Sequence, residues 1–261
     1  MPRLGLGTWP MDDSQAAVAV AAAVRAGYRL IDTAENYRNE HGVGTALRDG
    51  GVARAELFVT SKFNRRWHSV DGVRQACVQS LARLGLDYLD LFLVHWPNPE
   101  QDRYVEAVEG LMRLLDDGLI RAVGTSNFTP AHLQRLFDAG LTPHVNQIQL
   151  HPYRLRPDVV ALHRDRGILT QSWSPLGWGT GLLADETIAR VARRHGRSPA
   201  QVVLRWHIQQ GLVPLPRSTD PGRQAQNLAS FDFTLTDDDM VMLGSLDRPD
   251  LPMVDADTYG H

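Results

Sequence analysis

The chain has 261 residues, of which 43% are apolar and 22% charged, and its formal net charge is −3. This composition excludes an intrinsically disordered chain, and the scattered basic residues exclude the electrostatic footprint of a nucleic-acid-binding protein. Cys77 is the single cysteine, so a disulfide framework is excluded and no thiolate metal site is expected.

The apolar run near the N-terminus does not indicate a membrane segment. It covers residues 16–24, which is too short to span a bilayer. It follows Asp12, Asp13 and Ser14, which are helix-capping residues, where a signal peptide has a basic region. We therefore expect no membrane partner, no export signal and a cytoplasmic location.

From the first strand onward, short apolar strands alternate with stretches of helical spacing. Glycines stand directly after several of these helical stretches, where a left-handed residue ends a helix: Gly27, Gly85, Gly118, Gly140 and Gly167. Predicted strands cover residues 3–8, 28–33, 57–62, 89–96, 120–126, 145–150, 168–173 and 212–216. Predicted helices include residues 14–26, 70–84, 102–117, 130–139, 185–195, 199–209, 220–228 and 236–246.

Eight strands that alternate with helices, without a linker, predict an α/β protein with one closed (β/α)8 barrel over residues 1–261. Extra helices are expected after strands seven and eight, and residues 248–261 are interpreted as an irregular tail. A doubly wound open sheet is the second possibility. Two Gly-x-Gly segments, at Gly5 and Gly42, do not fit a Rossmann fingerprint and are interpreted as packing and turn glycines.

Four reactive side chains fall at the predicted C-terminal ends of neighbouring strands, where a (β/α)8 barrel carries its active site. Asp32 ends strand two, Tyr37 follows it, Lys62 ends strand three and His95 ends strand four. Lys62 is the single lysine among 27 basic side chains. Codon bias explains the excess of arginine, whereas the lysine marks either a chance survivor or a place where arginine would not work.

These four side chains are chemically complementary. A tyrosine has a pKa of about 10, and a nearby ammonium lowers it toward the range useful for acid catalysis. A carboxylate beside the lysine would hold the ammonium in place, and a histidine can orient a substrate oxygen. The set describes protonation of a carbonyl oxygen while another group attacks the carbon. Taken singly, each residue has an ordinary structural explanation, such as a helix cap, rim packing or a buried histidine.

A series of motifs resembles the aldo-keto reductase family from about Leu4 to Tyr259, most of all its bacterial 2,5-diketo-D-gluconate reductase branch. The motifs are Gly5-Leu-Gly-Thr-Trp, Leu30-Ile-Asp-Thr-Ala-Glu-Asn-Tyr, Thr60-Ser-Lys, Leu93-Val-His-Trp-Pro, Gly124-Thr-Ser-Asn-Phe, Asn146-Gln-Ile-Gln-Leu-His-Pro-Tyr and Ser174-Pro-Leu-Gly. The resemblance implies that Tyr37 is the general acid, that Lys62 and Asp32 tune it, and that His95 orients the carbonyl. It also implies an enzyme that acts as a monomer, without a metal.

The same resemblance implies that NADPH is the hydride donor. Ser126, Asn127 and Gln147 would bind the nicotinamide carboxamide, and Trp173 would stack on the ring. Other cofactor contacts would come from Thr8, Trp9, Ser174, Leu176 and Gly177.

The 2′-phosphate and adenine region would be formed by Arg217, Ser218, Thr219, Arg223, Gln226 and Asn227. Asp220 departs from many relatives, and its carboxylate would repel a 2′-phosphate. NADH therefore stays possible as the cofactor.

Substrate and reaction class leave alternatives open. Trp9, Phe63, Trp67 and Trp96 are candidates for the substrate pocket. Arg65 and Arg66 would favour anionic or polyhydroxylated substrates if they face it, and are otherwise exposed loop arginines without a role. Candidate substrates are keto-sugar acids, α-keto esters and methylglyoxal-like carbonyls. A lyase that forms a Schiff base on Lys62 is one alternative function. A cofactor-binding module without activity is the other.

Overall fold

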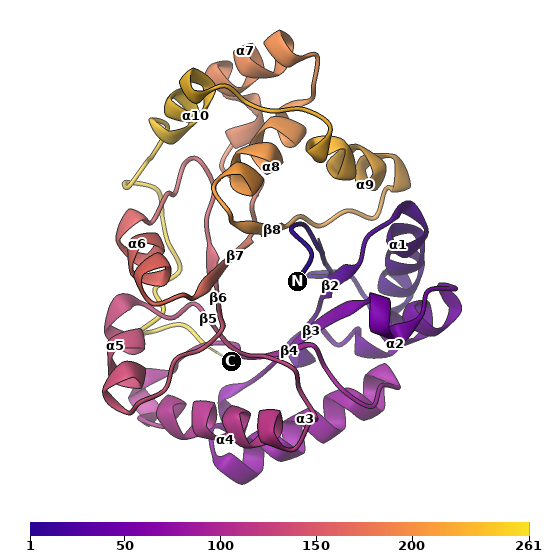
Figure 1. Ribbon diagram of the computed structural model, residues 1–261, viewed down its shortest axis with the longest axis vertical. Helices are drawn as coiled ribbons and strands as arrows, with labels where there is room; N and C mark the ends of the chain where they lie inside the picture. Colours follow the sequence, from indigo (N-terminus) through magenta and orange to yellow (C-terminus); the bar gives the residue numbers. More distant parts are fainter. Residues whose placement is uncertain (261) are drawn as a thin grey trace.

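The computed structural model describes residues 1–260, and its eight parallel strands follow one another around a barrel with the helices outside (Figure 1). This confirms the (β/α)8 fold and rejects the doubly wound sheet, in which the strand order would reverse. Most strands are shorter than predicted, because residues at their ends leave the ladder for loops. The strands are β1 Leu6–Gly7, β2 Leu30–Asp32, β3 Phe58–Phe63, β4 Leu91–Val94, β5 Val123–Ser126, β6 Val145–Gln149, β7 Leu169–Trp173 and β8 Val213–Leu215.

The helices agree with the predicted ranges to within two residues at each end, and the additional helices α2 and α6 complete the alternation. The five predicted helix-ending glycines all have left-handed φ values, from 65° to 112°. The helices are α1 Asp13–Ala26, α2 Glu40–Asp49, α3 Val70–Leu84, α4 Tyr104–Asp116, α5 Pro130–Asp138, α6 Pro157–Asp165, α7 Glu186–His195, α8 Pro199–Gln209, α9 Pro221–Leu228 and α10 Asp237–Gly244.

Hydrogen bonds between the first and last strands close the barrel. The amide of Gly5 donates to the carbonyl of Pro214 (3.1 Å), and the amide of Gly7 donates to that of Pro216 (3.2 Å). In a regular parallel ladder the residue at Pro216 would donate back to the carbonyl of Gly5, but proline has no N–H. Across this contact the amides around β1 donate to carbonyls around β8, and Pro216 donates none in return. β1 itself is two residues long.

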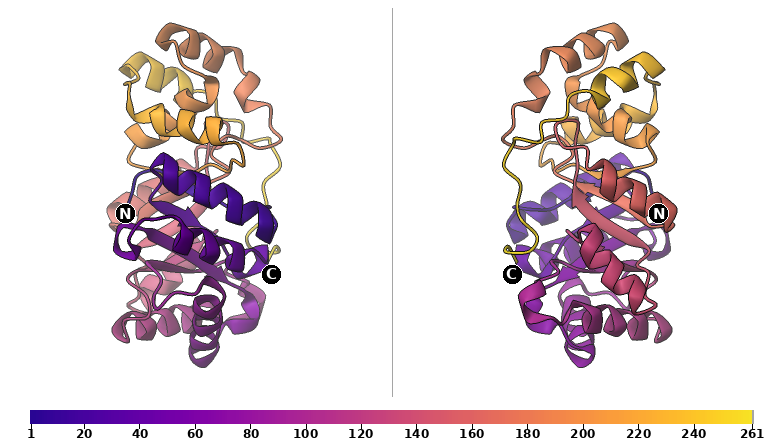
Figure 2. Two further views of the ribbon diagram at one scale, coloured as in Figure 1. Left: turned by 90° about the vertical axis from the view of Figure 1, so that its right-hand side faces the viewer. Right: turned by 90° about the vertical axis from the view of Figure 1, so that its left-hand side faces the viewer.

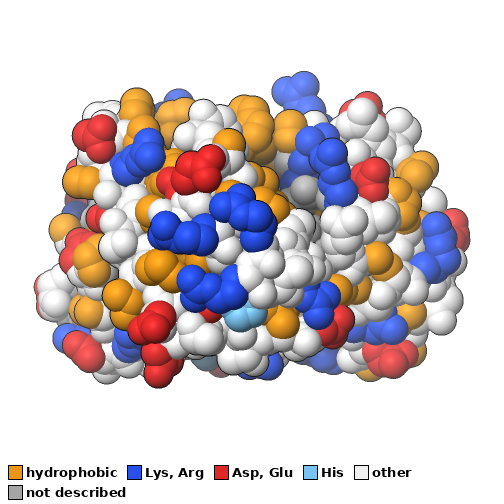
Figure 3. Space-filling view, turned by 90° about the horizontal axis from the view of Figure 1, so that it is seen from above, with side chains coloured by type: hydrophobic (Ala, Val, Ile, Leu, Met, Phe, Trp, Pro, Cys, Tyr) orange, Lys and Arg blue, Asp and Glu red, His pale blue; other side chains and the backbone are white. Residues whose placement is uncertain are grey.

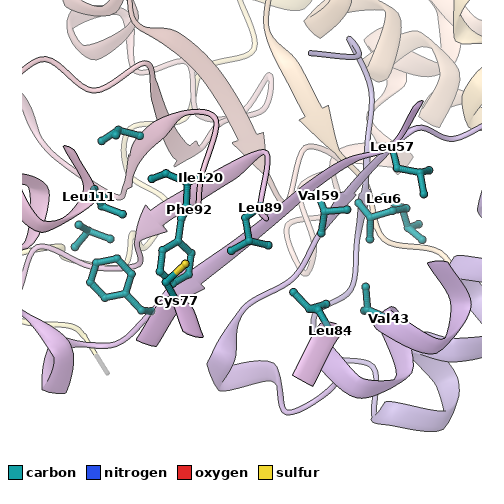
Figure 4. Packing of buried hydrophobic residues seen from close by; sticks show 14 of the residues in the cluster. Leu6, Val43, Leu57, Val59, Cys77, Leu84, Leu89, Phe92, Leu111 and Ile120 are labelled. Atoms are coloured by element: carbon teal, nitrogen blue, oxygen red, sulfur yellow. The ribbon is translucent and has the colours of Figure 1, made fainter. Parts of the chain in front are cut away.

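The core lies between the barrel and its surrounding helices. Figure 4 shows Leu6 and Val59 of the strands facing Val43 of α2 and Leu84 of α3, with Phe92 of β4 beside Cys77. Helix α2 packs closely against its neighbours because it contains glycines. A Cβ added at Gly42 would lie 1.9 Å from the carbonyl oxygen of Asp13. The Gly42 segment is thus a packing feature, as predicted, and Cys77 is buried in the same core.

The tail after α10 runs along the side of the barrel, away from α10 (Figure 2). On the face that carries α7 to α10, arginine side chains gather with acidic ones between them (Figure 3). Beneath the surface of this face, Arg194 of α7 pairs with the buried Asp239 of α10 (2.7 Å). Among the described residues, no helix is long and apolar enough to cross a bilayer.

Candidate active site

The four predicted reactive side chains lie together at the C-terminal end of the barrel. Asp32 is the last residue of β2 and pairs in register with Thr60 of β3, so that Lys62 lies two residues farther along the next strand. Tyr37 closes a short 3-10 helix, η1 Glu35–Tyr37, and His95 directly follows β4. Parallel pairing places all these strand ends on one rim, which explains why residues up to 63 positions apart meet.

Lys62 is fully buried, and its ammonium contacts three oxygen acceptors. Its Nζ donates to Asp32 Oδ1 (2.5 Å), to the backbone carbonyl of Thr33 (2.9 Å) and to the hydroxyl of Tyr37 (3.3 Å). A compact ammonium can point three N–H bonds at three acceptors around one point, whereas a planar guanidinium cannot. This geometry explains a lysine at this position in a chain that otherwise uses arginine.

Lys62 and Tyr37 are both protonated at neutral pH. Burial alone lowers the pKa of Lys62, but the Asp32 carboxylate and Tyr37 outweigh it, and the pKa lies above its usual value. Burial raises the pKa of Tyr37, and the Lys62 ammonium offsets this only in part. The expectation that the ammonium would bring the pKa of Tyr37 below 10 was therefore wrong for this state, because desolvation of the phenolate is the larger effect. The tyrosine holds a proton that it can donate.

A buried hydrogen-bond chain continues from Asp32 across the barrel. The side-chain amide of Gln147 donates to Asp32 Oδ2 (2.8 Å) and to Gln171 Oε1 (2.9 Å). Both carboxylate oxygens of Asp32 thus have donors, which fixes its orientation toward Lys62. Gln171 was not predicted; the signal was a glutamine in the middle of a predicted barrel strand, a type of residue that needs a partner when buried.

The residues expected near a nicotinamide are linked to one another. Trp173 Nε1 donates to Asn127 Oδ1 (2.8 Å). The amide nitrogen of Asn127 donates to Ser126 Oγ and to the backbone carbonyl of His95 (3.1 Å each). Ser126 Oγ in turn donates to the carbonyl of Gln147 (3.0 Å). These bonds hold the edge of the Trp173 indole at the rim, next to His95.

A cavity of about 800 Å³ opens above these groups. Tyr37, His95 and Asp32 line it, and the rings of Tyr37 and His95 meet edge to face with centroids 5.7 Å apart. The cavity continues past Trp173 to Arg217, so it is elongated along the rim. Predicted residues that line it are Trp9, Trp96, Ser126, Asn127, Gln147, Trp173, Ser174, Leu176, Gly177 and Arg217.

Phe63, Trp67 and Thr8 are among the predicted site residues that do not line this cavity. Phe63 is fully buried in the core against Phe92 (5.0 Å between ring centroids), because its side chain points out of the barrel toward α3. Trp67 donates its indole N–H to both oxygens of Glu35 (3.0 Å each) and is held outside the cavity. Thr8 is buried, and its hydroxyl donates to the carbonyl of Asp32 (3.0 Å). Phe63 and Trp67 were thus wrongly assigned to the substrate pocket, and Thr8 acts in this structure as a rim support.

Several cavity residues escaped the sequence analysis. Trp178 lies in the glycine-rich segment after β7 and meets Trp9 edge to face (5.4 Å between centroids). Val254 and Tyr259 belong to the tail that was interpreted only as irregular, and Gln149 ends β6. A tryptophan between glycines was the available signal for Trp178. For Val254 and Tyr259 the sequence offers no signal, because only packing brings the tail to the rim.

The predicted phosphate region follows β8 and enters α9. Arg217 is exposed at the cavity, and neither Arg217 nor Arg223 has an ion-pair partner among the described residues. Asp220 is the N-cap of α9 and accepts from the amide of Arg223 (2.8 Å). Ser218, Thr219, Arg223, Gln226 and Asn227 lie outside the cavity lining. Asn227 and Ser218 are buried, whereas Arg217, Arg223 and the carboxylate of Asp220 are exposed, so this region presents two cations and one anion.

Residues 3–248 match the profile of the aldo/keto reductase family. The chain belongs to this family. Methylglyoxal reductase DkgA of Escherichia coli is 43% identical, with 100% of this chain and 94% of the relative covered. The 2,5-diketo-D-gluconic acid reductase B of a Corynebacterium species is 44% identical, with 98% and 92% covered. The solved structure of a Gox0644 mutant in complex with NADPH is 42% identical, with a TM-score of 0.94 and coverage of 99% and 94%.

Family membership confirms the predicted reductase class of enzyme and the resemblance to the bacterial diketogluconate reductase branch. The geometry of the site agrees with a reductase. The buried ion pair of Lys62 and Asp32 contacts the protonated phenol of Tyr37 at the floor of the cavity. A Schiff base on Lys62 requires a neutral amine, whereas the raised pKa of Lys62 keeps this amine charged. The geometry therefore disfavours the lyase alternative.

Proposed function

We propose that the protein is an NADPH-dependent reductase that converts aldehydes and ketones to alcohols, with methylglyoxal-like carbonyls, α-keto esters and keto-sugar acids as candidate substrates. One observation carries the proposal: the Tyr37 hydroxyl lies 3.3 Å from the Lys62 ammonium and faces a cavity large enough for a cofactor and a small substrate. A binding module has no need of a proton donor tuned by a buried ion pair.

The cavity has the features that NADPH requires. It extends from Tyr37 to Arg217, and its lining combines an indole face at Trp173 with one cation, Arg217, directly after β8. Trp173 and Gln147 would hold the nicotinamide, Leu176 and Gly177 the pyrophosphate, and Arg217 and Arg223 the 2′-phosphate. When bound, NADPH supplies the hydride for the carbonyl carbon.

The residues of this chain supply the rest of the reaction. His95 orients the substrate oxygen toward the Tyr37 hydroxyl, and Tyr37 donates its proton to that oxygen as negative charge develops there. The Lys62 ammonium stabilises the phenolate that forms, and Asp32 keeps the ammonium in place. Because burial keeps Tyr37 protonated, the unliganded site is ready for reduction.

The direct test follows the absorbance of NADPH and NADH with methylglyoxal, an aryl aldehyde, an α-keto ester and a keto-sugar acid. We expect oxidation of NADPH with several of these carbonyls. Cofactor binding, seen as quenching of tryptophan fluorescence, without turnover of any carbonyl would favour the binding module. A covalent adduct on Lys62 after borohydride treatment with a carbonyl would favour the lyase.

A monomeric state and a cytoplasmic location stay predictions.

Replacing Arg217 with alanine is expected to raise the KM for NADPH about tenfold and to leave the KM for NADH unchanged. The reason is that arginine binds a phosphate through two charge-assisted hydrogen bonds, and only NADPH carries the 2′-phosphate. Steady-state kinetics with both cofactors measure this. The exposed Arg193 of α7, changed to alanine, is the control. An equal rise for both cofactors would place Arg217 elsewhere on the cofactor.

A further inference from the structure

A pair of glutamines joins the barrel interior to the floor of the cavity. Strands β6 and β7 lie side by side in the barrel (Figure 1), and Gln147 of β6 is in register with Gln171 of β7. Register partners on neighbouring strands point to the same face of a sheet, and here that face is the inside of the barrel. Gln171 is fully buried and does not line the cavity, whereas Gln147 does.

Both hydrogens of the Gln147 amide are used inside the barrel. The Asp32 carboxylate, which is paired with Lys62, offers only acceptors, so the group of Gln147 that faces it must be the amide nitrogen. This nitrogen donates one hydrogen to Asp32 Oδ2 (2.8 Å) and the other to Gln171 Oε1 (2.9 Å). Gln147 Oε1 accepts no hydrogen bond from the described residues. This oxygen is therefore the group that Gln147 can offer to a ligand in the cavity.

Gln171 supplies the acceptor for the second of these hydrogens. Its own amide nitrogen donates to Met1 Sδ (3.3 Å), and a thioether sulfur is a weak acceptor. Without the oxygen of Gln171, one N–H of Gln147 would be buried without a partner, which is costly. The Gln147 amide could satisfy this N–H by rotating toward the cavity, and Asp32 Oδ2 would then lose its donor.

A change at Asp32 reaches the proton donor. Asp32 Oδ1 accepts from Lys62 Nζ (2.5 Å), and the same ammonium donates to the hydroxyl of Tyr37 (3.3 Å). A carboxylate that lacks its second donor is free to tilt, and the ammonium that it holds moves with it. The position of Lys62 relative to Tyr37 therefore depends on the acceptor at position 171.

We infer that Gln171 is a positioning residue for carbonyl reduction, which acts through Gln147. It holds the Asp32 carboxylate in place under Lys62, and it keeps Gln147 Oε1 turned toward the nicotinamide carboxamide. Gln171 itself lies outside the cavity lining and touches neither substrate nor cofactor. The inference rests on the proposed reductase function and adds to it a residue behind the site that sets the geometry of the proton donor.

The first test measures kcat/KM for methylglyoxal with NADPH. Gln171→Met keeps the length of the side chain and removes the acceptor, and we expect kcat/KM to fall about tenfold, on the order of the contribution of one hydrogen bond. Gln171→Asn, which is one methylene group too short to reach Gln147, should lose as much. Gln171→Glu should keep about a third or more of the activity at pH 6, because burial keeps a carboxyl group neutral and its oxygen still accepts.

A double-mutant cycle tests whether the effect passes through Gln147. Because Gln171 is expected to act through its partner alone, Gln171→Met should cause no further loss of kcat/KM in a Gln147→Met background. A further tenfold loss in that background would overturn the inference.

The second test measures binding without turnover. The 3-acetylpyridine analogue of NADP⁺ carries a methyl group in place of the carboxamide NH2, so it cannot donate to Gln147 Oε1. By titration of tryptophan fluorescence, the wild type should bind NADP⁺ about tenfold more tightly than the analogue. In Gln171→Met this ratio should fall to about threefold or less, because the Gln147 amide is no longer held in one orientation. A loss of stability alone would not change the ratio.

Gln201→Met is the matched control. Gln201 is a buried glutamine of α8 whose Oε1 accepts from the amide of Ser198 (3.0 Å), and it lies outside the cavity lining. This variant should keep the wild-type kcat/KM and the wild-type binding ratio. A Gln171→Met variant that also keeps either of them would overturn the inference. If the wild type reduces no carbonyl compound, the proposed function fails, whereas the binding ratio still tests how Gln171 orients Gln147.

Discussion

Replacing Tyr37 with phenylalanine is expected to lower kcat/KM for carbonyl reduction about 100- to 10,000-fold, the usual contribution of a positioned general acid. The substitution removes a single oxygen at the cavity floor and keeps the ring that meets His95 (centroids 5.7 Å apart). Lys62 keeps its bonds to Asp32 and to the carbonyl of Thr33, so the ion pair beneath the site stays intact. Affinity for NADPH, measured by fluorescence titration, should change less than twofold.

The matched control is Tyr104→Phe, which removes the same oxygen from a buried tyrosine of α4, away from the cavity lining. Its turnover should equal that of the wild type. If Tyr37→Phe retained a tenth or more of the wild-type activity, Tyr37 would not be the proton donor. A parallel loss of turnover in Tyr104→Phe would mean that the assay reports general damage to the fold.

Acidification from pH 7 to pH 5 is expected to destabilise the protein strongly. Burial lowers the pKa of four histidines, His68, His151, His163 and His207, to about 4 each. In the unfolded chain a histidine has a pKa of about 6.5, so the unfolded state binds more protons between pH 6.5 and pH 4. The free energy of unfolding therefore falls as the pH falls through this window, by about 1.4 kcal/mol per pH unit for each histidine at most.

Urea unfolding at a series of pH values measures this slope. His68→Leu should reduce it by about one proton, since the ring nitrogens of His68 have no hydrogen-bond partner among the described residues and the ring packs against Phe63. His41→Leu makes the same change at an exposed position of α2 and should leave the slope as it is. Equal stability at pH 5 and pH 7 in the wild type would show that these histidines accept protons without unfolding.

The sequence allowed the barrel and the four reactive residues to be predicted because both depend on local pattern. Apolar strands and helix-ending glycines define the alternation, and parallel pairing then brings every strand end to one rim. Asp32, Lys62 and His95 follow directly from their positions at those ends. The predicted strand bounds were less accurate, as at β1, where only Leu6 and Gly7 of the predicted residues 3–8 pair with β2.

Only the tertiary structure decided which side chains reach the cavity and what their environment does to them. Phe63 and Trp67 stand beside Lys62 in the sequence, yet the alternation of β3 and the Glu35 contact turn them away. Tyr259 lies far along the chain, yet packing of the tail brings it to the same rim. The raised pKa of Tyr37 is likewise a property of packing, because desolvation depends on every neighbour that excludes water, and local sequence does not record those neighbours.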